Sequence, residues 1–255
     1  FEDFFILDEK DSGHDNHEKY KLRYNCKNIN DLLLDSLKWR KVESIDDEKI
    51  TNHFQSKAFQ LGLNYDYFLN TIIELSCVEN HPLNSDRLFR ILSNHKMSVR
   101  DGFWQYFVIG HSRKDSEENT QSIRRLLDFA WQPNISTTIS DETCRLVAQT
   151  LVWVLATTDR VLRDKVTKAL VNLLEQKPAT LLLILTRFKK IDDLYILERL
   201  YAICYGVVLR TDSEQGIGLL AQYTYNTIFK RRNPPTHILL RDYARNIIEY
   251  ALYKN

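Results

Sequence analysis

The sequence predicts an all-α protein, and two observations carry that prediction. Of 255 residues only 7 are Gly and 5 are Pro, and there is little Asn-Gly or Asp-Gly turn signal, whereas a sheet protein of this length needs many tight turns. In addition, one helix-like pattern recurs. Residues 99–101 read Val-Arg-Asp, residues 162–164 and 240–242 read Leu-Arg-Asp, and each opens an apolar run. Recurrence at repeat-sized intervals is typical of stacked helical hairpins, so we expect an α-helical solenoid with little or no sheet.

The recurring pattern has a register. From its first residue, apolar side chains follow at offsets of four, seven and eight, which lie on one face of a helix. The three copies supply Phe103, Tyr106 and Phe107, then Val166, Ala169 and Leu170, then Ala244, Ile247 and Ile248, and a looser fourth copy from Leu197 supplies Tyr201, Cys204 and Tyr205. We expect these faces to form the core.

The arginine that follows the first residue is the second common element of the pattern. Arg100, Arg163 and Arg241 occupy equivalent positions in the repeat register. Bonds from their guanidinium groups to carboxylates or carbonyls of the neighbouring hairpin would form a ladder along the stack. We therefore assign these three arginines an inter-repeat structural role.

For residues 1–135 the sequence predicts helices that are less regular than those that follow. Residues 8–19 are polar and are expected to form a loop, and residues 111–120 a charged linker. Helices are expected to begin near Asn30 and at Ser44, where Asp47 three residues on gives a near capping box. Further helices are predicted over 65–78, 85–94, 98–110 and 120–131, and Pro133 ends the last of them.

For residues 136–255 the sequence predicts three regular HEAT-like helical hairpins. Ser140 is expected to cap the first helix, with Asp141 and Glu142 at its positive end. The six helices are predicted over 140–156, 159–176, 178–189, 192–210, 212–231 and 236–253, with Pro178 in a first turn, where proline is tolerated. Because the loops are short, sequential helices should pack as antiparallel neighbours. We expect one continuous solenoid that is a fragment of a longer chain.

Composition bounds the location and partners of the protein. The formal net charge of +1 argues against a dedicated nucleic-acid binder but leaves room for a local basic patch. The four cysteines are far apart and form no Cys-x-x-Cys pair, which indicates a reducing compartment. The longest apolar runs, 146–156 and 181–185, are too short to span a bilayer. We expect a cytoplasmic protein that does not engage membranes.

Sites for cofactors and catalysis are not evident in the sequence. The glycines form neither a phosphate-binding loop nor a dinucleotide turn. His14 and His17 make a loose pair in a polar segment without the four ligands that zinc requires. Adjacent carboxylates lie at predicted helix starts, where they complement the helix dipole. We expect no cofactor, no metal and no enzymatic activity in this segment, although a parent chain could be an ATPase.

Parts of the chain resemble known helical repeats. Residues 162–173, Leu-Arg-Asp-Lys-Val-Thr-Lys-Ala-Leu-Val-Asn-Leu, resemble the second helix of a HEAT repeat, and residues 240–251 are similar. Segments 159–164, 197–201 and 235–245 resemble the helical region of large bacterial STAND-type NTPases, including NACHT-like antiphage proteins of the Avs type. In that family an N-terminal effector and a nucleotide-binding motor precede a long helical sensor. The resemblance implies a bacterial sensor segment without motor or effector.

Three functions are compatible with these observations. The first is a protein-recognition sensor or scaffold within a large STAND-type NTPase such as those of antiphage defence, which would oligomerise through its missing motor. The second is a free-standing HEAT-like adaptor, and the third is a helical enzyme with a dispersed active site.

A protein partner is expected, and three aromatic residues are candidates to bind it. Trp104, Tyr243 and Tyr250 fall between the core offsets of the repeat. Large aromatic side chains bury much area at low entropic cost, so they are common anchors for partners. The alternative is that they pack on the neighbouring hairpin.

Overall fold

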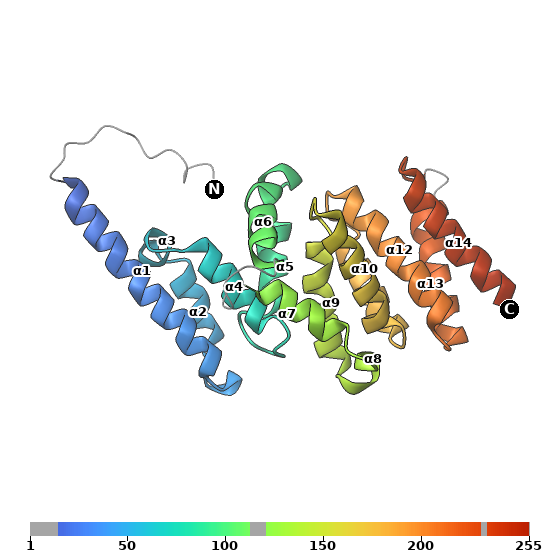
Figure 1. Cartoon of the computed structure of the whole chain (residues 1–255), viewed down its shortest axis with the longest axis horizontal. Helices are drawn as coiled ribbons and strands as arrows, with labels where there is room; N and C mark the ends of the chain where they lie inside the picture. Colours follow the sequence, from blue (N-terminus) through green and yellow to red (C-terminus); the bar gives the residue numbers. More distant parts are fainter. Residues whose placement is uncertain (1–14, 113–120, 231–233, 255) are drawn as a thin grey trace. The chain divides into compact units, whose positions relative to one another are not determined.

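The chain is all-α. A computed structural model describes residues 15–112, 121–230 and 234–254, and within these ranges every regular element is helical and none is a strand. The chain divides into two compact units, of which the first ends at Thr71 and the second begins at Ile72. The division lies within α4 (Tyr65–Leu75) (Figure 1). The fold class predicted from the scarcity of Gly and Pro is thus confirmed.

The first unit is built on the long helix α1. Its elements are α1 (Asp15–Trp39), the 3-10 turn η2 (Val42–Ser44), α2 (Asp47–Phe54), α3 (Lys57–Leu61) and the start of α4. The rings of Phe54, Phe59 and Phe68 form its core, with centroids 4.8 to 5.7 Å apart. At Gly62 an added Cβ would lie 2.4 Å from the backbone of Cys26, so only glycine allows α1 to approach this closely.

The start of α1 corrects one prediction. Residues 15–19 were expected in a loop and instead belong to a helix that continues through Asn30, the predicted start. Residues 8–14 of the expected loop, residues 113–120 of the expected linker and His14 lie outside the described residues. From residue 19 to residue 29 the side chains of α1 are exposed apart from the half-buried Cys26, so this part of the helix has no buried apolar face. This is why the helix start could not be recognised.

The second unit contains the remaining helices. They are α5 (Ser85–Ser93), α6 (Met97–Ser112), α7 (Ser122–Ala130), α8 (Ile135–Thr138), α9 (Asp141–Val154), α10 (Arg160–Leu174), α11 (Pro178–Phe188), α12 (Leu194–Arg210), α13 (Glu214–Thr224) followed by a π-helical segment η4 (Tyr225–Phe229), and α14 (Ile238–Lys254). Predicted starts agree closely from α9 to α12. Ser140, Asp159 and Asp193 cap α9, α10 and α12 through their side chains, and Pro178 opens α11.

Alternate helices of the second unit form two rows. α9, α11 and α13 pack on one another in succession, and α10, α12 and α14 do the same, while α9 contacts α10 and α13 contacts α14 (Figure 1, green to red). The rows include helices from before residue 135, since α5 packs on α9, and α7 and α8 pack on α10. The sequence analysis separates a less regular helical part from regular hairpins at residue 135, whereas the two compact units divide between residues 71 and 72.

α9 lies at the centre of this unit. Every residue from 146 to 155 is buried. The helices α5, α7, α10 and α11 all pack against it. These residues are apolar except for Gln149 and Thr150, as is typical of a helix enclosed by neighbours.

α6 departs from the predicted repeat register by one residue. In α10 the predicted core positions Leu162, Val166 and Leu170 are buried. In α6 the predicted core residues Val99 and Tyr106 are exposed instead. The buried side chains of α6 are Arg100, Trp104, Phe107, Val108 and His111. A shift of one residue turns a helix by about 100°, so α6 presents a different face to the core from α10.

Candidate functional site

The three aromatic residues proposed as anchors lie in different environments. Trp104 is completely buried, donates from Nε1 to the Trp153 carbonyl oxygen at 2.8 Å, and stacks on Phe107. The prediction that Trp104 binds a partner is therefore wrong, because the one-residue rotation of α6 turns it inward. Tyr243 and Tyr250 are half-buried on α14 and stay candidates.

Arg100 alone makes the inter-helix ion pairs predicted for the three arginines. Its side chain is 1% exposed, and its two terminal nitrogens lie 3.1 Å from an Asp192 oxygen and 3.3 Å from an Asp193 oxygen. The guanidinium carbon is 5.1 Å from the centroid of the Trp153 ring. Asp193 also caps α12, so this contact fastens α6 to the start of α12.

The other two arginines do not continue a ladder of ion pairs. Arg163 donates to the Thr157 carbonyl oxygen of its own hairpin at 3.0 Å and covers the Tyr195 ring of α12 at 4.8 Å. Arg241 is half-buried and makes no ion pair with any residue that the structure describes. The ladder prediction is wrong for these two, because their helices keep the repeat register and hold this position at the edge of the core.

Carboxylates outnumber cations around Arg100. Asp192 accepts the Met97 backbone N–H at 2.9 Å, and this bond, with Arg100, holds the pKa of Asp192 below its usual range. Asp101 differs, because burial and the nearby Asp193 raise its pKa despite Arg100. One buried oxygen of Asp101 has no hydrogen-bond partner among the described residues. Its ionised form is therefore destabilised by the fold.

We expect Asp101→Asn to raise the melting temperature at pH 7. In the folded chain the pKa of Asp101 is raised from 3.8, so folding favours the protonated carboxyl. Below about pH 3.8 this carboxyl is protonated in the folded and the unfolded chain, and it costs no stability. As the pH rises through the folded pKa the carboxylate forms in the folded chain, and stability is lost. The gain from Asp101→Asn should accordingly disappear below that pH. Thermal melts from pH 3 to pH 7 measure it. Asp242→Asn, on the exposed face of α14, should give no such gain, and a gain independent of pH would contradict the assignment.

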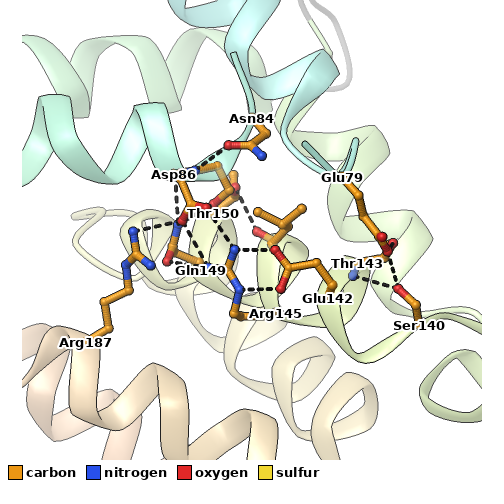
Figure 2. A network of polar contacts seen from close by, with 12 residues as sticks. Glu79, Asn84, Asp86, Ser140, Glu142, Thr143, Arg145, Gln149, Thr150 and Arg187 are labelled. Carbon is orange, nitrogen blue, oxygen red and sulfur yellow. Dashed lines mark hydrogen bonds and ion pairs between the residues drawn. The ribbon is translucent and has the colours of Figure 1, made fainter. Parts of the chain in front are cut away.

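A second polar network joins α5, α9 and α11 (Figure 2). Asp86 in the first turn of α5 accepts two hydrogen bonds from Arg145, at 3.0 and 2.9 Å, and one from Gln149 at 3.1 Å. Arg187 of α11 lies 2.8 Å from the same carboxylate. Arg145 also pairs with Glu142 at 2.6 Å. Two guanidinium groups therefore face two carboxylates.

The surrounding polar groups complete this network. Gln149 donates to the Ser85 carbonyl oxygen at 2.8 Å, and Thr150 donates to the Ser85 hydroxyl at 2.8 Å. At the edge of the view in Figure 2, Glu79 accepts from the hydroxyls of Ser140 and Thr143, which lower the pKa of Glu79. The side chains thus bind the three helices to one another.

The network is not arranged for acid–base catalysis. Burial would raise the pKa of Asp86, but the bonds from Arg145 and Gln149 outweigh it and hold this pKa below the usual range. A general acid or base near neutral pH needs a carboxylate with a raised pKa. The Asp86 carboxylate is instead a fixed acceptor between three helices, so we assign the network a structural role.

The remaining candidates for chemistry give no site. In the described ranges no group of three or more His, Cys, Asp and Glu side chains is placed to hold a metal ion. Burial raises the pKa of the Cys144 thiol to about 12 and raises that of Cys204 as well. Thiols of this kind are not nucleophiles at neutral pH. His17 belongs to α1 and not to a loop.

The sequence-based reasoning missed the most exposed aromatic residue of α6. Tyr106 is 80% exposed. Gly102 and Gly110 lie four residues to either side of it, and a Cβ at either would meet no atom of the described residues within 4 Å. The Gly-x-x-x-Tyr-x-x-x-Gly spacing was a signal for this face, because glycine inside a helix costs about 0.5–1 kcal/mol relative to alanine and here no close packing requires it.

Comparison of the chain with protein-family models, curated proteins and solved structures gives no match. In the part of the chain that the structure describes, none of the helices has both the length and the apolar character needed to cross a bilayer.

Proposed function

We propose that this chain is a protein-binding helical scaffold, and that it serves as a sensor segment of a large STAND-type NTPase. The observation that carries the proposal is the outer face of α6, where the exposed Tyr106 lies between two glycines. The polar networks around Asp86 and Arg100 hold helices together, so neither is available to act on a substrate.

The face of α6 has the chemistry of a protein contact. A tyrosine supplies a large rigid surface with a hydroxyl at its end, and such residues are enriched among binding hot spots. Because Gly102 and Gly110 have no side chains, a partner's backbone can approach the helix closely on both sides of the ring. Val99, seven residues before Tyr106 and therefore on the same side of α6, is also exposed and extends the apolar surface.

The assignment to a STAND-type sensor rests on the resemblance of segments 159–164, 197–201 and 235–245 to that family. The two rows of helices in the second unit support it, since helical sensors are built from such pairs. The reading frame of the gene tests it directly. A phosphate-binding loop encoded upstream in the same frame is expected, and a complete gene without one would favour the free-standing adaptor.

Substitution of the glycines of α6 tests whether these two positions are free of close packing. Gly102→Ala and Gly110→Ala should each stabilise the chain by about 0.5–1 kcal/mol, because alanine reduces the conformational entropy of the unfolded chain and its methyl group meets no neighbour. Urea titration followed by circular dichroism measures this. Gly206→Ala is the matched control and should destabilise, because its Cβ would lie 2.7 Å from Val171.

Tyr106→Ala tests the binding face. In the parent protein, expressed in cells challenged with a panel of phages, Tyr106→Ala should abolish protection while leaving the melting temperature within about 2 °C of wild type. Tyr253→Ala, which removes an equally exposed ring from α14 (83% exposed), should keep protection. If Tyr106→Ala protects as well as wild type, this face is not the binding site.

A further inference from the structure

The first half of α1 carries an exposed concentration of positive charge. Between Glu18 and Asp31 the sequence contains four cations and no acidic residue. Their side chains are all exposed, and none forms an ion pair with any residue that the structure describes. They are Lys19, Lys21, Arg23 and Lys27. The net charge of +1 for the whole chain conceals this local excess.

Two tyrosines lie among these cations. Tyr20 and Tyr24 are 68% and 65% exposed, and a spacing of four places both rings on one side of the helix. Lys27 follows at offset seven from Tyr20 and lies on the same side. Cations and aromatic rings along one exposed helix are the elements from which proteins bind single-stranded nucleic acid, because cations neutralise phosphates and rings stack on bases.

The arrangement fits a nucleic-acid strand better than a membrane surface. A helix that lies in a membrane interface gathers its apolar side chains on one face. Here the exposed apolar residues Leu22, Ile29 and Leu32 share the side of the helix roughly opposite the tyrosines. A membrane bound through that side would leave Tyr20 and Tyr24 facing away from it, whereas stacking on bases uses both rings.

We propose that residues 19–28 of α1 form a binding site for single-stranded nucleic acid. Lys19, Lys21, Arg23 and Lys27 contact phosphates, and Tyr20 and Tyr24 stack on bases. Binding is independent of base sequence, because every base offers a ring face. The site is separate from the face of α6, so the proposed function does not depend on it.

The experiment measures the affinity of the 255-residue chain for a fluorescein-labelled 20-nucleotide oligo(dT) by anisotropy. With up to four phosphates neutralised, log Kd should rise with log salt with a slope of about 3. The double variant Lys21→Glu/Arg23→Glu should weaken binding at least tenfold at 50 mM salt and lower the slope. Tyr20→Ala and Tyr24→Ala should each weaken binding about fivefold or more without changing the slope.

Matched variants separate the site from general charge effects. Lys165→Glu/Lys168→Glu changes the net charge equally on the exposed side of α10 and should bind like wild type, as should Tyr253→Ala. Circular dichroism confirms that each variant is folded. The proposal is overturned if wild type does not bind at 50 mM salt, or if the α10 variant loses as much affinity. It is also overturned if the chain binds phosphatidylserine vesicles through α1 but not the oligonucleotide.

Discussion

Trp104→Ala is expected to destabilise the chain by about 3–5 kcal/mol. The indole is completely buried, stacks on Phe107 and donates a hydrogen bond to the Trp153 carbonyl oxygen. Its removal leaves a cavity and a buried carbonyl without that donor, and both effects cost stability. Urea unfolding followed by circular dichroism measures the free energy of unfolding.

Tyr106→Ala, two residues further along α6, is the control for this result. Because Tyr106 projects into solvent, its truncation should change the free energy of unfolding by about 0.5 kcal/mol or less. The repeat register of the sequence predicts the reverse order, with Tyr106 in the core and Trp104 outside. A loss smaller than about 1 kcal/mol for Trp104→Ala would favour that register.

The second large effect is expected at Arg100. Arg100→Met keeps most of the side-chain volume but leaves the Asp193 carboxylate, which is 4% exposed, without its cation. Removing one partner of a buried pair typically costs about 3–5 kcal/mol, since the other charge stays buried. Arg241→Met, at the equivalent position of α14, should cost about 0.5 kcal/mol or less.

A double variant identifies the cause of the Arg100 effect. Asp193→Asn removes the stranded charge and keeps a side chain that can still cap α12, because asparagine caps helices as well as aspartate does. Arg100→Met/Asp193→Asn should therefore be more stable than Arg100→Met alone. If the double variant is no more stable, then lost packing on Trp153, and not an unpaired charge, explains the loss.

The regular helices were predictable from local chemistry. The starts of α9, α10, α11 and α12 follow from a capping side chain or a first-turn proline, and these signals act within a few residues. The capping residue differed at α13, where Ser213 and not Asp212 accepts the bond, and at α2, where Asp46 and not Ser44 is the cap. The start of α1 was not predicted because residues 19–25 are all exposed and so lack the buried apolar face by which a helix is recognised.

The face that α6 presents to the core could not be predicted from its own residues. Val99, Phe103 and Tyr106 make as good an apolar stripe as Leu162, Val166 and Ala169 in α10. The face that α6 turns inward includes Arg100, which pairs with Asp192 and Asp193, more than 90 residues away. A buried guanidinium requires these carboxylates, and nothing in the local sequence indicates them. The candidate surface at Tyr106 was missed for this reason.

The enclosure of α9 has a consequence for how the second unit opens. In a linear array whose hairpins touch only their neighbours, the ends can unravel one hairpin at a time. Here α5, α7, α10 and α11 each cover part of one central helix, so the detachment of any of them exposes part of α9 and weakens the support of the others. These helices should unravel together as one cooperative block. The amide hydrogens of residues 146–155 should accordingly exchange with deuterium more slowly than those of the outer helices α13 and α14.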